Sequence, residues 1–238
     1  MTVRLIAWNC CEKFATNYVR LRDLDFDVAV IAECGPFQVD ALQSRGLTSS
    51  FVQPIPGSSK HLGVFAQEPW TVMLHPMIPT APWLLPIAVT GPVEFTLLGF
   101  WGVEPQRFGS YTSQLRQVIE DVLPLVDGPA ILAGDFNAPI PATINAHAEN
   151  VRRLQGQRLV SAFTATRPWD APLEPTYRWS REEYPFHIDH VFVPEEWVSQ
   201  LSMTVGDYDQ WVASRRSDHV PLLVDIAMSD NAEGVAES

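Results

Sequence analysis

The chain has 238 residues, of which 46% are hydrophobic and 18% charged, an ordinary balance for a globular protein. No segment approaches the roughly 18 consecutive apolar residues of a membrane-spanning helix, so we expect a soluble protein without membrane insertion. The formal net charge of −12 argues against an enzyme that grips long stretches of duplex nucleic acid by its phosphates, because such a grip grows with the number of lysines and arginines.

Nothing in the composition marks a boundary between domains, and the length suits one large α/β or all-β domain. We predict a single domain over residues 1–228 and a flexible acidic tail over residues 229–238. The chain begins with a strand-like run rather than a signal peptide, and its three cysteines are an odd number with two adjacent in sequence. These features predict a cytoplasmic protein without a disulfide framework.

The first part of the chain reads as strand, helix and strand. Val3–Trp8 is a short β-rich run with Asn9 at its end, and residues 15–24 carry a weak helical stripe. Residues 28–32 form a continuous apolar run, typical of a strand covered on both faces, and Glu33 follows it. Each predicted strand therefore ends in a residue that can act as a ligand.

The middle of the chain predicts short antiparallel strands separated by prolines. A helix is expected over residues 37–45, after a Gly-Pro break. Several β-rich pieces follow, centred on Phe51, Val64, Val72 and Ile87. Residues 94–101 predict a further strand, and residues 110–123 predict an amphipathic helix with Ser110 as its N-cap.

The stretch Ala130–Asn137, Ala-Ile-Leu-Ala-Gly-Asp-Phe-Asn, is the most informative in the sequence. Its apolar run has the length of a strand, and Asp135 and Asn137 face the same way if the backbone stays extended. Gly134 lets the chain leave the sheet and lets a ligand approach the backbone. Aspartate and asparagine side chains can accept a proton from water, bind a hard cation or hydrogen-bond to a phosphate.

The last part of the chain predicts a helix, a loop and two strands, over residues 146–154, 168–175, 188–193 and 220–226. Asp189 lies at the start of the first of these strands, and Asp218 and His219 lie just before the second.

Polar residues are thus predicted at the carboxyl ends of some strands and at the amino ends of others. Asn9, Glu33 and Asp135 lie at carboxyl ends, whereas Asp189 and the Asp218-His219 pair lie at amino ends. Antiparallel placement of the two groups of strands would bring all of these residues to one rim. We expect them to share one site.

Five pieces of the sequence, in this order, resemble the endonuclease/exonuclease/phosphatase superfamily, the exonuclease III and deoxyribonuclease-like metal-dependent phosphohydrolases. The pieces are Trp8-Asn9, Ala32-Glu33-Cys34, Gly134-Asp135-Phe136-Asn137, Ile188-Asp189-His190 and Ser217-Asp218-His219. The resemblance implies an α/β (α+β) sandwich of two mixed β-sheets packed face to face, with helices on the outer faces.

The resemblance also implies a divalent cation, Mg²⁺ or Mn²⁺, held by Glu33 with help from Asn9 and Asp218. Hard oxygen ligands suit such ions. Zinc is disfavoured, because a zinc site would be expected to have softer or more nitrogen ligands.

The catalytic roles that the resemblance implies fall on four residues. Asp135 would position or deprotonate the attacking water, Asn137 would contact the phosphate, and His219, oriented by Asp189, would stabilise the phosphoryl charge. In-line attack at phosphorus needs a placed nucleophile and donors for the developing charge, so these roles agree with the residue types.

One position departs from the family pattern. Many members carry histidine or tyrosine at the end of the strand before the long helix, where this chain has Trp101. An indole nitrogen only donates a hydrogen bond, so Trp101 is expected to bind substrate without shuttling a proton.

Four further residues are candidates for substrate binding. Arg178, Arg215 and Arg216 flank the proposed catalytic groups and can hold a phosphate bidentately. His187 shares a strand face with Asp189 by its spacing, whereas His190 points to the other face and is expected to pack.

The sequence thus predicts a Mg²⁺- or Mn²⁺-dependent phosphodiesterase, a nuclease acting on single-stranded or small nucleic acid, without an obligate protein partner. A phosphatase, or a phospholipid or sphingomyelin phosphodiesterase of the same superfamily, is an alternative. A second alternative is a binding module that has kept the fold and lost catalysis.

Overall fold

The computed structural model describes residues 1–35, 42, 46–53, 55–139, 145–168, 170–178 and 186–228. The helix expected over residues 37–45 lies, apart from Leu42, outside the described residues, and so does the expected tail over residues 229–238. Among the described residues, no helix has the length and apolar character needed to cross a membrane.

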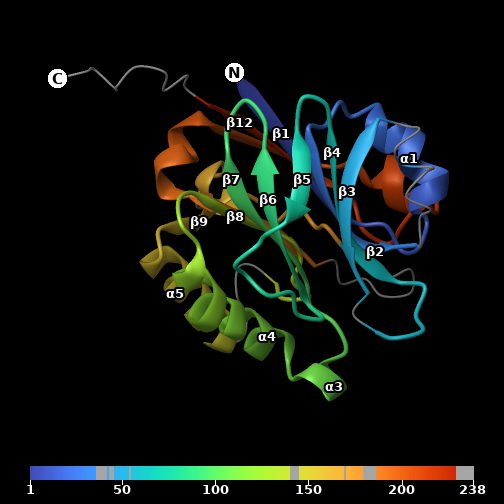
Figure 1. The fold of residues 1–238 in the computed structure, drawn as a ribbon. Helices are drawn as coiled ribbons and strands as arrows, with labels where there is room; N and C mark the ends of the chain where they lie inside the picture. The colour runs from blue at the N-terminus through green and yellow to red at the C-terminus, as the bar shows by residue number, and fades with distance from the viewer. Residues whose placement is uncertain are drawn as a thin grey trace.

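Twelve strands of the described chain form two six-stranded sheets (Figure 1). The first sheet contains β1 (Thr2–Asn9), β2 (Val28–Cys34), β3 (Leu47–Val52), β4 (His61–Gln67), β11 (Leu201–Val205) and β12 (Leu222–Ala227). The second contains β5 (Thr71–Leu74), β6 (Leu84–Thr90), β7 (Phe95–Trp101), β8 (Ala130–Asp135), β9 (Leu159–Ser161) and β10 (Asp189–Pro194).

The strand order is β11-β12-β1-β2-β4-β3 in the first sheet and β5-β6-β7-β8-β10-β9 in the second. Each sheet has one parallel pair, β1 with β2 and β7 with β8, and its other pairs are antiparallel. The two mixed sheets confirm the fold class expected from the sequence.

The longer helices are α1 (Phe14–Arg22), α4 (Tyr111–Gln117) and α5 (Asn145–Gly156). Shorter helical segments are α3 (Pro105–Phe108), η1 (Val118–Val122), η2 (Leu123–Leu125), α6 (Ala162–Ala165), η3 (Glu195–Gln200) and η4 (Asp209–Ala213). The helix expected over residues 110–123 is present as α4, η1 and η2 in succession, and the Ser110 side chain caps it by accepting from the Ser113 amide.

Alternation along the strands creates the layers. On β1, Leu5 and Ala7 belong to the apolar core between the sheets, whereas Ile6 and Trp8 pack in the layer that contains α1. On β8, Leu132 faces the layer of α4 and α5 instead. The helices accordingly cover the outer faces, with α1 beside the first sheet and α4 and α5 beside the second (Figure 1).

Several short elements were not expected from the sequence, among them β9, α6, β11 and η4. Strand β11 pairs with β12 along its length, but Met203 is its one fully buried residue. Ser202 and Thr204 interrupt the apolar run, so the sequence carries a weak strand signal there.

Candidate active site

The two sheets meet through a hydrogen bond between Asn9 and Asp135. Asn9 follows Ala7 by two residues on β1, and Asp135 follows Ala133 by two on β8, so both continue the inward faces of their strands. Asn9 Nδ2 donates to Asp135 Oδ2 over 2.9 Å. This end of the core is therefore polar.

Asp189 and His219 complete the buried centre. Asp189 begins β10 directly opposite Asp135 on antiparallel β8, and His219 Nδ1 lies 2.7 Å from Asp189 Oδ2. The three side chains each offer one ligand atom, and these atoms lie within 4.8 Å of one another. Asp135, Asp189 and His219 are at most 4% exposed. The structure thus brings together residues that are 84 positions apart in sequence.

Two hydroxyl groups that were not singled out in the sequence hold this centre in place. Thr176 Oγ1 accepts hydrogen bonds from the amides of Ile188 and Asp189, at 3.0 and 3.1 Å. Ser217 Oγ donates to the Asn9 carbonyl at 2.7 Å and accepts from the His219 amide at 3.0 Å. The Ser-Asp-His piece of the family pattern contains Ser217, but Thr176 stands in no motif.

Glu33 reaches the site through a break in strand regularity. Strict alternation on β2 would turn Glu33 to the same side as Ile31, toward the outer layer. The pairing with β4 instead shifts register between Ile31 and Cys34, and Glu33 has φ of 54°. This bulge turns the side chain inward, where Glu33 Oε1 accepts from Asn9 Nδ2 over 3.3 Å.

Opposite environments act on the two central titratable groups. The pKa of Asp135 is raised to about 7, first because burial disfavours its charge and second because Asp189 is close, although His219 opposes this rise. Burial lowers the pKa of His219, but the charge and hydrogen bond of Asp189 outweigh burial and raise it to about 9. The centre therefore offers a base that titrates near neutrality beside an imidazolium donor.

Asn137 forms hydrogen bonds with the carboxylate of Asp135. The backbone N–H of Asn137 donates to Asp135 Oδ1 at 2.9 Å. Its side-chain Nδ2 donates to the Gly102 carbonyl at 2.9 Å and to Asp135 Oδ2 at 3.3 Å. These bonds use the side-chain donors that a phosphate contact would need. The arrangement favours Asn137 as a positioning residue for Asp135 over the phosphate contact expected from the sequence.

The residues around Glu33 fit a hard divalent cation. Lys60 Nζ lies 2.6 Å from Glu33 Oε2, so a positive charge already stands on this carboxylate. Asp189 Oδ1 is buried without a hydrogen-bond partner among the described residues. Asp218 is partly exposed, and its Oδ1 lies 3.4 Å from Ser217 Oγ. The carboxylate oxygens of Glu33, Asp189 and Asp218 are donors of the hard kind that Mg²⁺ and Mn²⁺ prefer.

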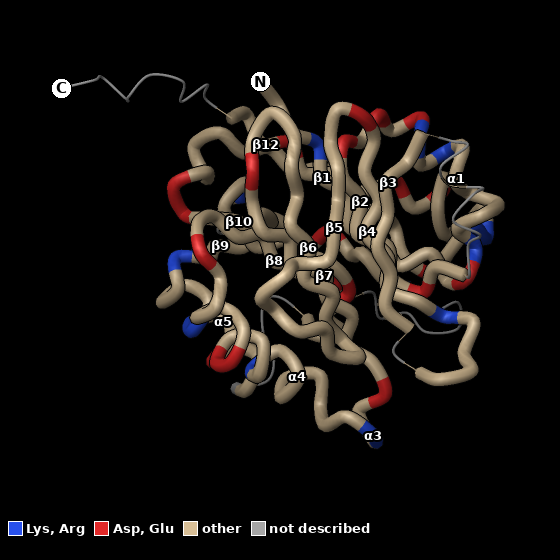
Figure 2. The backbone as a smooth tube through the Cα atoms, viewed as in Figure 1, with Lys and Arg blue, Asp and Glu red and all other residues tan. Residues whose placement is uncertain are grey.

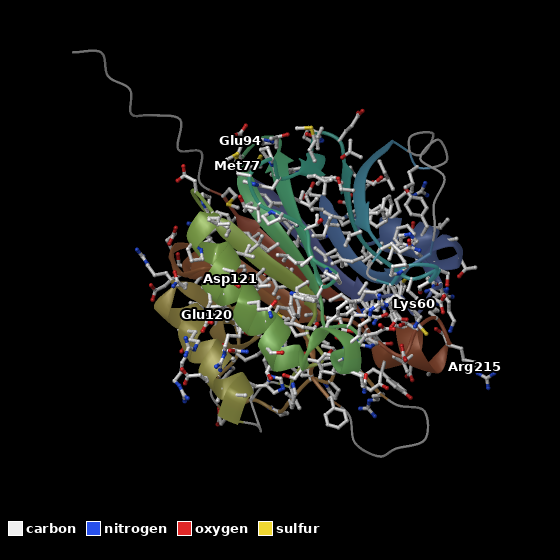
Figure 3. All side chains as sticks on the ribbon, turned by 60° about the horizontal axis from the view of Figure 1, so that its bottom comes forward. Lys60, Met77, Glu94, Glu120, Asp121 and Arg215 are labelled. Atoms are coloured by element: carbon white, nitrogen blue, oxygen red, sulfur yellow. The ribbon has the colours of Figure 1, made fainter. Side chains whose placement is uncertain are left out.

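The three candidate arginines differ in their exposure and in the partners that they already have. Arg178 is exposed, its amide donates to the Asp218 carbonyl at 3.1 Å, and its guanidinium lies over the Tyr208 ring. Arg215 projects from the ribbon into solvent (Figure 3). Arg216 Nη1 donates to Asn17 Oδ1 at 3.0 Å, so this guanidinium is already engaged. The structure leaves Arg178 and Arg215 exposed for a substrate contact.

His187 does not lie where the sequence placed it. Strand β10 begins at Asp189, so the alternation used for His187 does not extend to it. Its side chain is fully buried, with Nδ1 2.6 Å from the Glu174 carbonyl and the ring against Phe163. Substrate cannot touch it without rearrangement. His190 is buried as expected, with Nε2 2.7 Å from the Ala138 carbonyl.

Gly134 is required where β8 lies against β7. Its φ is 141°, and a Cβ there would lie 1.9 Å from the carbonyl oxygen of Phe100 on the neighbouring strand. Glycine is therefore needed here for the close approach of β8 to β7.

Lys60 was missed in the sequence, although a signal was present. Lys13 and Lys60 are the only lysines in the chain. Lys60 binds Glu33 at the site, and Lys13 Nζ donates to the carbonyl of Arg215, three residues before Asp218, at 3.0 Å. Rarity in the composition could have marked them.

Comparison with known families places these residues in context. The sequence model described as the Endonuclease/Exonuclease/phosphatase family matches residues 20–219. No curated protein sequence matches the chain.

Solved structures share the fold at low sequence identity. An AP endonuclease from Archaeoglobus fulgidus has 12% identity and a TM-score of 0.74, over 93% of this chain and 98% of its own. The 3'-5' exonuclease NExo from Neisseria meningitidis has 16% identity and a TM-score of 0.69, over 95% and 100%. TDP2 from Caenorhabditis elegans has 13% identity and a TM-score of 0.70, over 96% and 76%.

Proposed function

Because the chain belongs to the endonuclease/exonuclease/phosphatase family, we propose that it is a divalent-metal-dependent phosphodiesterase that hydrolyses nucleic acid. The observation that carries the proposal is the buried group of Asp135, Asp189 and His219, joined to Asn9 at the common edge of the two sheets. A purely structural protein has no use for two buried carboxylates there, because each costs free energy to desolvate.

The chain's own residues supply the groups for in-line attack at phosphorus. Asp135 accepts a proton from the attacking water, and Asn9 and Asn137 fix the direction of its oxygens through hydrogen bonds. His219, held by Asp189, donates from its free Nε2 to the phosphoryl oxygens as negative charge develops.

Glu33, with Asn9 and Asp218, would hold the cation. A bound Mg²⁺ or Mn²⁺ supplies charge neutralisation at the phosphoryl oxygens. Lys60 must then leave Glu33, and its ammonium group is long enough and exposed enough to turn toward a phosphate.

Nucleic acid is the favoured substrate class because the structural neighbours are named as an AP endonuclease and an exonuclease, and one is a NExo bound to product DNA hairpin. In Figure 2 the Lys and Arg positions of the described residues are interspersed with acidic and neutral ones. With a net charge of −12, this pattern favours single-stranded or short substrates over long duplex.

The first test is hydrolysis of bis(para-nitrophenyl) phosphate with Mn²⁺ and with a chelator. We expect chelation to abolish turnover, and Asp135→Ala and His219→Ala to lower kcat at least about 100-fold while the melting transition is retained. Asp127→Asn is the matched control, because it neutralises an exposed carboxylate in a surface loop. Metal-dependent turnover that persists in both Asp135→Ala and His219→Ala would contradict the proposed active site.

A panel of substrates then tests the nucleic-acid preference. Single-stranded, duplex and abasic DNA, RNA, a phospholipid and inositol phosphates are each offered with and without Mn²⁺. The proposal expects the fastest cleavage of single-stranded or short oligonucleotides. Faster hydrolysis of the phospholipid or of the inositol phosphates would instead select the alternative substrate class.

The cytoplasmic location remains a prediction that fractionation of cells can test.

A further inference from the structure

Tyr111 opens α4, and contacts on both sides of it in sequence fix its orientation. Ser110 Oγ accepts from the Ser113 amide at 3.2 Å and caps the helix. One turn further on, fully buried Gln114 donates to the Val103 carbonyl at 2.7 Å and accepts from the Val103 amide at 3.0 Å. Residues at i and i+3 share a helix face, so Tyr111 faces the same chain segment as Gln114.

The ring of Tyr111 lies against Gly102, the residue after β7. A Cβ at Gly102 would lie 3.1 Å from Tyr111 Cδ1 and 2.9 Å from the Phe136 carbonyl oxygen. The Gly102 amide donates to the Asp135 carbonyl at 2.8 Å, and the Gly102 carbonyl accepts from Asn137 Nδ2 at 2.9 Å. Tyr111 therefore packs on a residue that both Asp135 and Asn137 hold by hydrogen bonds.

The Tyr111 hydroxyl is suited to donate to a ligand. Burial and the negative charge of Asp135 raise the pKa of Tyr111, so the phenol keeps its proton at neutral pH. The side chain is only partly buried, and no described residue forms a hydrogen bond with its hydroxyl. A protonated hydroxyl near Asp135 that has no hydrogen-bond partner among the described residues can donate to a ligand.

Trp101 offers less to a substrate from a similar place. It pairs with Asp135 in the register of β7 and β8, but its side chain is 4% exposed and packs in the core between the sheets. An indole presents a single donor. Tyr111 can therefore supply a donor near Asp135 in addition to the single donor of Trp101.

We propose that the Tyr111 hydroxyl binds the phosphoryl group of the substrate and donates a hydrogen bond to one of its oxygens. This inference rests on the proposed function and adds a substrate-binding residue to it. It also answers the departure at Trp101, since a residue from the next helix supplies the donor that the strand end lacks.

The test compares Tyr111→Phe with Tyr208→Phe, which removes a hydroxyl from another tyrosine and keeps the ring. With bis(para-nitrophenyl) phosphate and Mn²⁺, we expect Tyr111→Phe to lower kcat/KM about 10-fold or more and Tyr208→Phe to leave it within about 2-fold. A calorimetric titration with inorganic phosphate in the presence of Mg²⁺ is the second measurement. Tyr111→Phe should weaken that binding about 5-fold.

Melting curves of both variants check that the fold is retained, which the phenyl ring favours because it keeps the packing on Gly102. Full turnover and full phosphate affinity in Tyr111→Phe, beside an inactive Asp135→Asn, overturn this inference and leave the proposed function standing. An equal loss in Tyr208→Phe overturns it as well. If the wild type shows no metal-dependent hydrolysis, the proposed function fails, and the phosphate titration alone decides whether Tyr111 binds phosphate.

Discussion

The space between the two sheets is apolar along most of its length and polar at one end, although the same strands line both parts. On β8 the inward residues are Ile131, Ala133 and Asp135 in turn, and on β1 Ala7 is followed by Asn9. All five side chains are at most 3% exposed. Strand geometry thus places apolar and polar residues in one layer, and only the residue type changes at the end.

This difference shows how burial is used in each part. In the apolar part, removing side chains from water stabilises the fold, by roughly 25 cal/mol for each Å² buried. At the polar end burial is unfavourable to charge, and the hydrogen bond from Asn9 offsets only part of that cost, as the raised pKa of Asp135 shows. We therefore expect a carboxylate to be tolerated at the polar end and to destabilise the fold two residues earlier on the same strand.

The largest effect is expected when an aspartate is moved into the apolar part. Ala133→Asp places a carboxylate between Gly99 and Val191, its neighbours on β7 and β10, without a described donor opposite it. We expect it to lower the free energy of unfolding by about 4 kcal/mol or more, measured by urea denaturation. Ala15→Asp, on the exposed side of α1, is the control and should change stability by less than about 0.5 kcal/mol. Equal free energies of unfolding for Ala133→Asp and Ala15→Asp would show that the apolar part tolerates a charge.

The reverse change removes the charge from the polar end. The pKa of Asp135 rises from an ordinary value of 3.8 to about 7 in the folded protein, so the folded state binds this proton more tightly. The stabilising contribution of Asp135 is therefore complete below about pH 4 and is lost as the pH rises through 7. Asp135→Asn removes the charged form.

At pH 8 with a chelator, we therefore expect Asp135→Asn to be more stable than the wild type by about 1 to 3 kcal/mol, although it is inactive. The difference should vanish near pH 4, where the wild-type carboxyl group is protonated. Urea denaturation at both pH values measures it. A variant that is less stable than the wild type at pH 8 would contradict the idea that charge at this position opposes folding.

The pH dependence of the rate is a sharper probe of the same pair of groups. Asp135 must be deprotonated and His219 protonated, so kcat/KM for bis(para-nitrophenyl) phosphate should rise up to about pH 7 and fall above about pH 9. Beyond either limit the rate should change about tenfold for each pH unit. Since Asp189 raises the pKa of His219, Asp189→Asn should move the alkaline limb to lower pH. An alkaline limb that stays in place would remove His219 from the mechanism.

The sequence located the polar end well because the strands behind it are covered on both faces. Such strands appear as unbroken apolar runs, so Asn9, Asp135 and Asp189 stood out as the polar residues where a run begins or ends. The carboxyl and amino ends of these strands then had to meet wherever antiparallel strands adjoin, as β8 and β10 do.

What the sequence did not predict depends on irregular backbone or on distant contacts. The bulge at Glu33 and the early start of β10 after His187 change which way side chains point, and neither leaves a periodic signal. Lys60 comes from the segment between β3 and β4 and meets Glu33 across 27 residues. Tyr111 reaches the site from a helix, so its role follows from packing on Gly102 rather than from spacing.

The smallest effect is expected from Lys60, the cation that already stands at the polar end. Its ion pair with Glu33 is partly exposed and competes with a divalent cation for the same carboxylate. Lys60→Met should therefore tighten Mn²⁺ binding about 3-fold, a size typical of removing a partly solvated ion pair. Calorimetric titration with Mn²⁺ measures it, and Lys13→Met is the control, because Lys13 donates to the Arg215 carbonyl instead of to a carboxylate. Unchanged or weaker Mn²⁺ binding in Lys60→Met would contradict Glu33 as a ligand of the cation and would favour the buried group of Asp135, Asp189 and His219 in its place.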